Sequence, residues 1–245
     1  MAEINIKGVI ASDENAEVYS WFGYNTASPS SVADQLAEIP DDEDVIVNIG
    51  SQGGEVTAGA EIYTMLKNLK NRVEVHITSL AASAASFIAM AGDNILISPV
   101  GQIMIHRARS SADGTFSDMS QAGQMLDSTD QMLVSVYKKK TGLSRNRLMQ
   151  MLKDETWMNA DDAVKLGFAD GKMFDDEDDD EPENDVVTAG LYNAVDGQIV
   201  LDPEKIAKVK AMLHGQPSDD DAKLIQEDSN KDTQLVNHKL SILFD

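Results

Sequence analysis

Short apolar, β-branched runs alternate with amphipathic patterns over residues 1–173, and this order is the feature that most limits the folds open to the chain. We expect strands at 4–10, 44–50, 73–79, 94–99 and 102–106. We expect helices at 30–39 (capped by Ser30 or Ser31), 55–69, 82–91, 117–137, 144–152 and 159–167. Strands that alternate with helices form a largely parallel sheet through right-handed crossovers. The sequence therefore predicts an α/β layered domain that ends near residue 173.

Acidic residues are concentrated after that domain. Residues 174–245 carry 19 acidic and 6 basic side chains, and the whole chain has a net charge of −22. Nine of the eleven residues 175–185 are acidic, a density that favours a disordered linker, which we place at 174–185. Residues 186–245 are expected to be a C-terminal extension of uncertain order. Because nucleic-acid binding depends on Lys and Arg, no nucleic-acid partner is expected.

The composition also removes several kinds of chemistry. The chain has no cysteine, which excludes disulfides, thiolate metal sites and cysteine catalysis. The first residues lack the apolar core of a signal peptide, and no apolar run is long enough to span a bilayer. We expect a cytoplasmic protein with no membrane contact, no metal and no cofactor.

Two glycine- or alanine-rich segments join a strand to a helix. In "GSQGGE", residues 50–55, two adjacent glycines can present backbone N–H groups to a developing negative charge, although such a pair is also common in tight turns. In "HITSLAASAASFIAMAG", residues 76–92, Ser83 falls at the start of the expected helix. A serine there is either a nucleophile beside unpaired N–H donors or an N-cap in a closely packed helix. Ser79 and Ser86 are interpreted as packing residues.

A nucleophilic serine needs a base, and the chain has four histidines. His106 ends the strand at 102–106 and precedes the polar loop "RARSSADG", a common place for a catalytic residue. His76 lies within a strand, and His214 and His238 lie in the weakly patterned extension. A histidine at the end of a strand is also often structural, so the residues alone leave this choice open.

Four segments occur in an order that carries a family resemblance: "SQGGEVTAGAEIYTML", "SLAASAASFIAMAG", "MIH" and "ETWMNADDAVKLGFAD". Together they resemble the ClpP family of serine peptidases over roughly residues 2–173, and most closely the phage- and prophage-encoded ClpP-like proteases, including head maturation proteases. The resemblance implies the ClpP/crotonase-type spiral of β-α units. It also implies that Ser83 is the nucleophile and His106 the general base, with the backbone N–H groups of Gly54 and Ala84 forming the oxyanion hole.

The chain departs from the family pattern at two positions. Gln52 stands where the family usually has proline, which changes the stiffness of the loop and leaves its N–H donors in place. Glu155 falls at the position of the third catalytic residue, normally an aspartate, and Asp154 immediately precedes it. Either carboxylate could orient the histidine, and the alignment favours Glu155.

The function implied is a serine endopeptidase, ATP-independent or assisted by a partner, that acts in phage or prophage capsid maturation on capsid or scaffold proteins. The resemblance further implies a ring-forming homo-oligomer whose ring-ring contact uses the helix at 117–137. No ATP site is present, so an ATPase unfoldase would be a separate partner. We also hypothesise that the acidic extension is a targeting segment or a self-cleaved tail.

Three alternatives remain at this point. The first is a housekeeping Clp proteolytic subunit that works with a separate unfoldase. The second is a crotonase-type enzyme, which shares the fold and would not need the Ser83–His106 pair. The third is a catalytically silent structural or scaffold protein of phage assembly, an option kept open by glutamate in place of aspartate at position 155.

Overall fold

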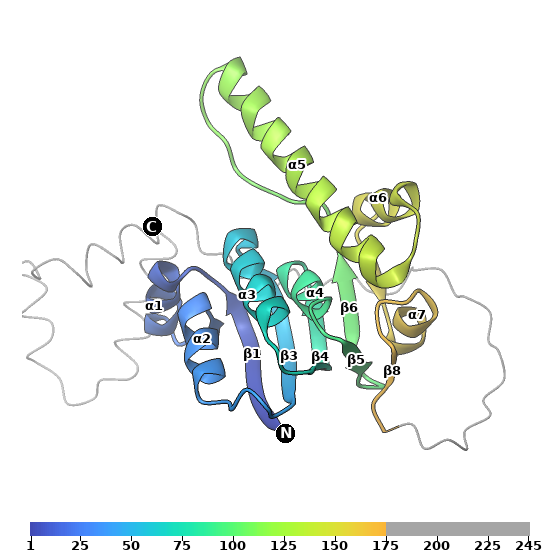
Figure 1. Cartoon of the computed structure of the whole chain (residues 1–245). Coiled ribbons are helices and arrows are strands. Elements are labelled where there is room, and N and C mark those ends of the chain that lie inside the picture. Colours follow the sequence, from blue (N-terminus) through green and yellow to red (C-terminus); the bar gives the residue numbers. More distant parts are fainter. Residues whose placement is uncertain (175–245) are drawn as a thin grey trace, which may run out of the picture.

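The computed structural model describes residues 1–174, which form a layered α/β structure around an eight-stranded sheet (Figure 1). The strands are β1 (Ala2–Ile10), β2 (Thr26–Ala27), β3 (Val45–Gly54), β4 (Val73–Ala82), β5 (Asn94–Ile97), β6 (Gln102–Ile105), β7 (Thr156–Met158) and β8 (Gly171–Lys172). The helices are α1 (Asp13–Trp21), α2 (Pro29–Ala37), α3 (Val56–Asn68), α4 (Ala84–Ala89), α5 (Phe116–Thr141), α6 (Arg145–Lys153) and α7 (Ala160–Lys165). The predicted linker, from residue 175 onward, and the predicted extension at 186–245 lie outside the described residues.

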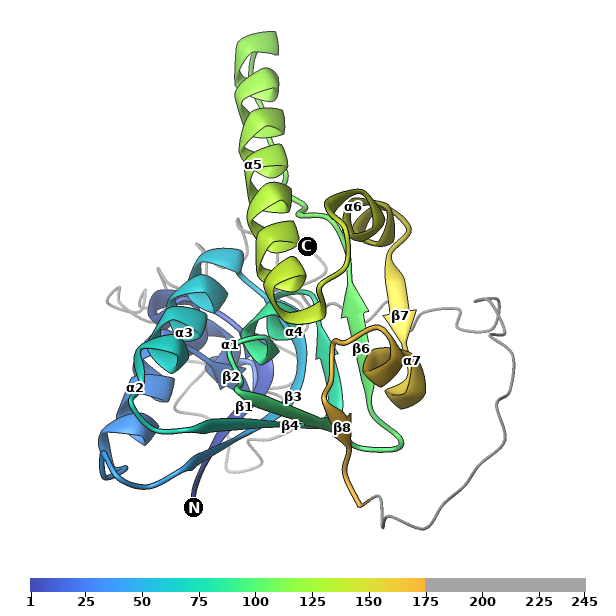
Figure 2. The same ribbon diagram turned by 45° about the vertical axis from the view of Figure 1, so that its right-hand side comes forward.

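The sheet is parallel at every pairing except that of β6 with β7. Its main path runs β2-β1-β3-β4-β5-β8. β4 is long enough to pair with two neighbours, because its first half lies beside β5 and its last residues lie beside β6. This division turns β6 and β7 away from the main sheet, where they carry α6 and α7 beside them (Figure 2). The predicted α/β class and the parallel sheet are confirmed.

Alternate residues of the central strands form the core. In β3, Val45, Val47 and Ile49 are fully buried while their neighbours are half-buried, which is the two-residue period of a strand with one covered face. The covering layer is formed by α2, α3 and α4, whose small residues allow close packing on the strands (Figure 1). The core therefore lies directly behind the carboxyl ends of β3 and β4.

Several predicted boundaries were wrong. α1 was not predicted at all, and neither were the short strands β2, β7 and β8. α2 is capped by Ser28, with Pro29 as its first residue, and not by Ser30 or Ser31. The strands β3 and β4 continue to Gly54 and Ala82, four and three residues past the predicted ends, because each pairs with its neighbours along that length.

The helix α5 divides into two halves with different surroundings. Its carboxyl half packs on the core through Leu133, Val134 and Tyr137 and ends at Gly142, which adopts a left-handed conformation. Its amino half projects away from the rest of the structure in both views (Figures 1 and 2) and exposes Phe116, Met119 and Met125. Among residues 1–174, only the carboxyl half of α5 is therefore stabilised by tertiary packing.

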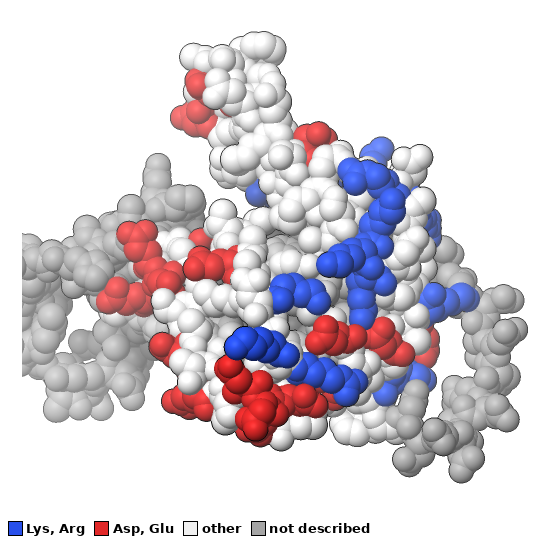
Figure 3. Space-filling model, in the orientation of Figure 1, with Lys and Arg blue, Asp and Glu red and all other residues white. Residues whose placement is uncertain are grey.

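Charge is unevenly distributed on the surface. In the view of Figure 3, Lys and Arg side chains gather over α6 and the carboxyl half of α5, acidic side chains gather over α1, and both kinds lie side by side toward the lower edge. Within residues 1–174, no helix combines the length and the apolar character needed to cross a bilayer.

Candidate active site

Three neighbouring parallel strands end at the same edge of the sheet and bring the predicted site residues together. β3 ends at Gly54, β4 ends just before Ser83, and β6 ends just before His106. The register pairs Ala82 with Met104, and the N–H of Ser83 donates to the carbonyl of Met104 at 2.9 Å. Because the carboxyl ends of parallel strands meet at one edge, the serine and the histidine become neighbours despite a separation of 23 residues.

Ser83 occupies a sharp turn between β4 and α4. Its backbone angles are φ 53° and ψ −119°, a region that L-residues rarely adopt and that costs about 1–3 kcal/mol. The turn lifts the hydroxyl out of the strand and points it into the cleft, as in other strand-to-helix nucleophile turns. The next residue, Ala84, begins α4, so its N–H has no partner within the helix.

The hydroxyl of Ser83 contacts the imidazole of His106. The distance from Oγ to Nε2 is 2.8 Å, which is hydrogen-bonding distance between a nucleophile and a base. The other ring nitrogen, Nδ1, is buried and has no hydrogen-bond partner among residues 1–174. The structure thus joins the serine to one ring nitrogen of the histidine and leaves the other ring nitrogen without an acceptor among the described residues.

Burial lowers the pKa of His106 below its usual value of 6.5, and the positive charge of Arg109 lowers it further. The carboxylate of Glu155, the backbone of Arg107 and the carboxylate of Asp130 raise this pKa and do not outweigh these effects. A histidine with a lowered pKa is neutral over a wider pH range, so Nε2 is available to accept a proton.

The two carboxylates predicted as alternatives for the third catalytic residue are bonded to other side chains. Asp154 is exposed, and its Oδ1 accepts a hydrogen bond from Gln150 at 2.7 Å. Glu155 accepts a hydrogen bond from Nη2 of Arg109, with which it also forms an ion pair. The structure therefore does not bring either carboxylate into contact with His106.

The glycine loop, residues 50–55, is held tightly against Ser83. Ser51 donates to the carbonyl of Gly8 at 2.7 Å and accepts from the N–H of Gly53 at 3.0 Å. A Cβ atom on Gly53, at φ 97°, would lie 2.7 Å from Cβ of Ser83 and 2.9 Å from the nitrogen of Ala84. Only glycine fits there, and its absence of a side chain keeps the loop in contact with the serine turn.

The segment after His106 is anchored by Asp130, a site residue that the sequence analysis missed. Asp130 is fully buried on α5, accepts from Nε of Arg107 at 2.6 Å and accepts from the N–H of Ala108 at 2.8 Å. The N–H of Arg107 also donates to Leu152 at the end of α6. His106 is therefore held in place through both α5 and α6.

The two other serines of the alanine-rich segment differ from each other. Ser86 is fully buried, and its hydroxyl donates to the carbonyl of Ser83 at 2.5 Å and contacts the hydroxyl of Tyr137 at 2.8 Å. Its interpretation as a packing residue is consistent with this. Ser79 is exposed on β4, so its interpretation as a packing residue was wrong.

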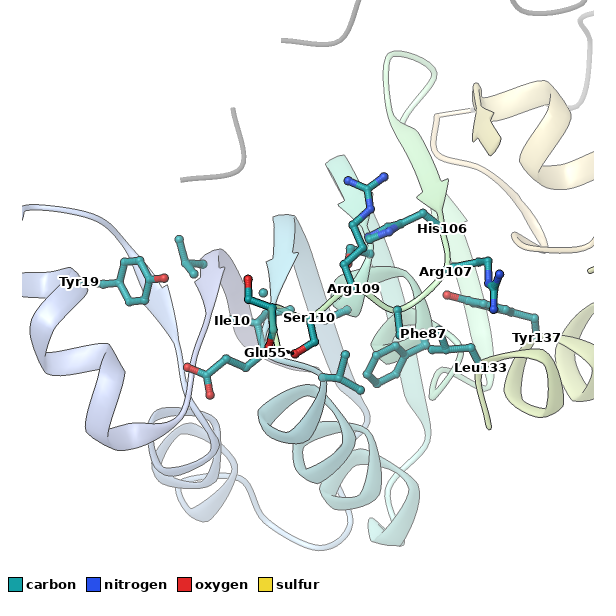
Figure 4. Close-up of a pocket in the computed structure, with 17 residues that line it drawn as sticks. Ile10, Tyr19, Glu55, Phe87, His106, Arg107, Arg109, Ser110, Leu133 and Tyr137 are labelled. Atoms are coloured by element: carbon teal, nitrogen blue, oxygen red, sulfur yellow. Dashed lines mark hydrogen bonds between the residues drawn. The ribbon is translucent and has the colours of Figure 1, made fainter. Parts of the chain in front are cut away.

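A cleft of about 510 Å³ opens over Ser83 and His106. Phe87, Leu133 and Val56 contribute apolar lining, and Arg109 and Glu55 contribute charge. Figure 4 shows Arg109 beside His106, with Glu55 and Tyr19 toward the opposite end. The cleft is large enough for several residues of an extended peptide, and the reactive pair lies on its wall.

Comparisons with known proteins all find Clp proteases. Residues 24–175 match the family model described as Clp protease. The ATP-dependent Clp protease proteolytic subunit 1 of Chlamydia abortus is 31% identical over 134 residues, which cover 53% of this chain and 70% of that protein. Its counterpart from Chlamydia muridarum is 28% identical over 134 residues with the same coverage. The ATP-dependent Clp protease proteolytic subunit of Deinococcus radiodurans is 31% identical over 132 residues, 53% of this chain and 64% of that protein.

Proposed function

This chain belongs to the Clp protease family and is a serine-type endopeptidase, and we propose that Ser83 and His106 carry out its reaction. The observation that carries the proposal is the 2.8 Å contact between Oγ of Ser83 and Nε2 of His106, at the wall of a cleft and on a strained turn. Strain at one residue and a perturbed pKa at its neighbour are typical of catalytic sites.

The reaction follows from this contact. His106 Nε2 takes the proton from Ser83 as Oγ bonds to the substrate carbonyl carbon, and the same proton then passes to the leaving amine as the C–N bond breaks. A water molecule next gives its proton to Nε2 and its oxygen to the acyl carbon. The bond from carbon to Oγ breaks, and Ser83 regains a proton from His106.

The oxyanion formed in both steps is proposed to be bound by the N–H groups of Gly54 and Ala84. Gly54, Ser83 and Ala84 line the same cleft, which supports this assignment. One such donor stabilises the transition state by about 3 kcal/mol.

The third catalytic residue is proposed to be Glu155, on the family resemblance of the segment 155–170. In this role its carboxylate would accept a hydrogen bond from Nδ1 of His106 and fix the tautomer that leaves Nε2 free to accept a proton. The unpartnered Nδ1 supports a need for such a group. Asp154 is the weaker candidate, because it is exposed and bonded to Gln150.

The proposal is tested by treating the purified full-length chain with a fluorophosphonate and measuring its intact mass, with the oligomer size recorded on the same samples. We expect one adduct, which maps to Ser83 and is lost in Ser83→Ala and strongly slowed in His106→Ala. A well-assembled wild-type protein that forms no adduct would refute the proposed site and favour the silent scaffold alternative.

The lowered pKa of His106 predicts the acid limb of the pH profile. Neutral His106 is the active form, so kcat/KM should be constant above the pKa and fall as the pH drops through it. Because burial and Arg109 lower this pKa, the midpoint should lie below 6.5. The measurement is kcat/KM for a small peptide across the acid range, with far-UV circular dichroism at each pH to confirm that the chain stays folded. A midpoint above 6.5 would contradict this account of the histidine.

We further propose a ring-forming homo-oligomer that cleaves capsid or scaffold proteins in phage maturation. This setting rests on the family resemblance and on the acidic extension after a protease domain at 1–173. The alternative is a housekeeping proteolytic subunit that works with an ATPase, and the names of the relatives support it. Cleavage of folded assembly proteins by the purified oligomer without ATP would favour the first setting, and dependence on an ATPase would favour the second.

A further inference from the structure

Only one of the two ring nitrogens of His106 has a hydrogen-bond partner among the described residues. Nε2 contacts Ser83 at 2.8 Å, and Nδ1 is buried without a partner among residues 1–174. A buried polar nitrogen without a partner is costly, and such atoms in a folded protein are rare. The site is therefore arranged for an acceptor that, in this structure, is bonded elsewhere.

Glu155, the carboxylate proposed to accept this hydrogen bond, is instead paired with Arg109. Nη2 of Arg109 donates to Oε2 of Glu155, and the two side chains are 63% and 38% exposed. Arg109 and Glu155 act on the charge of His106 with opposite sign, so the ion pair lies within electrostatic range of the imidazole. Figure 4 shows the guanidinium of Arg109 next to the ring of His106.

We propose that Arg109 is a positioning residue that competes with Nδ1 of His106 for the carboxylate of Glu155. While Arg109 holds Glu155, the imidazole lacks its orienting partner. When Arg109 releases it, Glu155 accepts the hydrogen bond from Nδ1–H and the triad is complete. This inference rests on the proposed roles of Ser83, His106 and Glu155.

The ion pair is weak enough for Glu155 to leave Arg109. An ion pair between exposed side chains is weak, because water competes for both groups. A hydrogen bond from a buried imidazole to a carboxylate is stronger, because few water molecules can replace it. Arg109 stands on the connection between β6 and α5 and lines the cleft, so its guanidinium can leave Glu155 without disturbing the core.

The test uses the full chain with Arg109→Gln, Arg109→Lys, Glu155→Ala and the double variant Arg109→Gln/Glu155→Ala, because alanine leaves no acceptor at position 155. The first readout is the rate of fluorophosphonate labelling at Ser83. We expect Arg109→Gln to label about 10-fold faster than wild type, a typical size for coupling between two sites. Arg109→Lys, which keeps the charge, should label at close to the wild-type rate. The double variant should not show the faster labelling of Arg109→Gln. The effects of the two substitutions on the labelling rate should therefore be strongly non-additive.

The second readout does not depend on activity. In protein with ¹⁵N-labelled histidine, the Nδ1 proton of His106 should exchange slowly with water in Arg109→Gln and rapidly in wild type and in the double variant. The pKa of His106 should also rise in Arg109→Gln. The charged groups that act on this histidine among the described residues are Arg109, Glu155 and Asp130, and the Arg109→Gln change removes the positive one.

The outcomes separate this inference from the proposed function. If wild type is labelled, Arg109→Gln is labelled no faster and its Nδ1 proton is not protected, the inference is overturned. The proposed Ser83–His106 site is unaffected by that result. A protected Nδ1 proton in wild type also overturns it, because Glu155 would then already be in place. Absence of labelling in every variant overturns the proposed function, and the histidine spectra still decide whether Arg109 and His106 compete for Glu155.

Discussion

Replacing Ser83 with alanine is expected to lower kcat for peptide cleavage by about a millionfold, the size seen when a serine nucleophile is removed from a complete site. The change deletes the oxygen that forms the acyl-enzyme, and His106 then has no hydroxyl to deprotonate. The fold should persist, because alanine adopts the same strained turn and loses a single hydrogen bond worth about 1 kcal/mol. The measurement is peptidase activity together with fluorophosphonate labelling and thermal unfolding.

Ser79→Ala is the matched control for that experiment. Ser79 lies on β4, the strand that leads to Ser83, and is exposed, so its loss should leave activity and labelling unchanged. If Ser83→Ala kept measurable turnover, or if Ser79→Ala removed the adduct, the nucleophile would have been assigned to the wrong serine.

Gly53→Ala is expected to reduce kcat by about 100- to 1000-fold, the cost of disturbing an oxyanion hole. The new methyl group would lie 2.6 Å from the carbonyl oxygen of Ala82, 2.7 Å from Cβ of Ser83 and 2.9 Å from the nitrogen of Ala84. The loop must then move away from the serine turn. In addition, alanine at φ 97° is strained, so the melting temperature should fall.

Gly123→Ala offers a control with the same chemical change. Gly123 lies inside α5, and a Cβ atom there would meet no heavy atom within 4 Å. Alanine should stabilise that helix by up to about 1 kcal/mol and leave kcat unchanged. Wild-type kcat in Gly53→Ala would show that the glycine loop does not depend on its contact with Ser83.

The alternation of strands and helices could be predicted because its signals are local. A β-branched run needs no distant partner to be recognised, and β3, β4 and β6 were all anticipated. The pairing of Ser83 with His106 was implied by the family resemblance alone, because the strand order that places β4 beside β6 could not be predicted from the sequence.

The elements that were missed have weak or overlooked local signals. α1 buries only Val18 and Tyr19, so it shows little amphipathic pattern. The start of α2 did carry a signal, since serine followed by proline is typical of a cap and a first helical residue, as in Ser28 and Pro29.

The fine structure of the site could not be predicted for a different reason. Arg109 and Glu155 are 46 residues apart, and nothing in either local sequence indicates that they pair. Asp130 is an acidic residue on a long helix, a pattern typical of the surface, yet it is fully buried because Arg107 and Ala108 bond to it. Tertiary contacts of this kind decide whether a correctly identified histidine is also correctly oriented.

The two halves of α5 imply that an isolated copy of this chain does not unfold as one cooperative unit. A helix without tertiary contacts is marginally stable in water at the length of the projecting half, so that half should melt before the sheet. Far-UV circular dichroism counts every helical residue, whereas fluorescence follows Trp21 and Trp157, which lie outside α5. The two probes should therefore give different unfolding curves. A melting temperature taken from fluorescence alone would report the unfolding of the α/β core and would not detect the earlier melting of the amino half of α5.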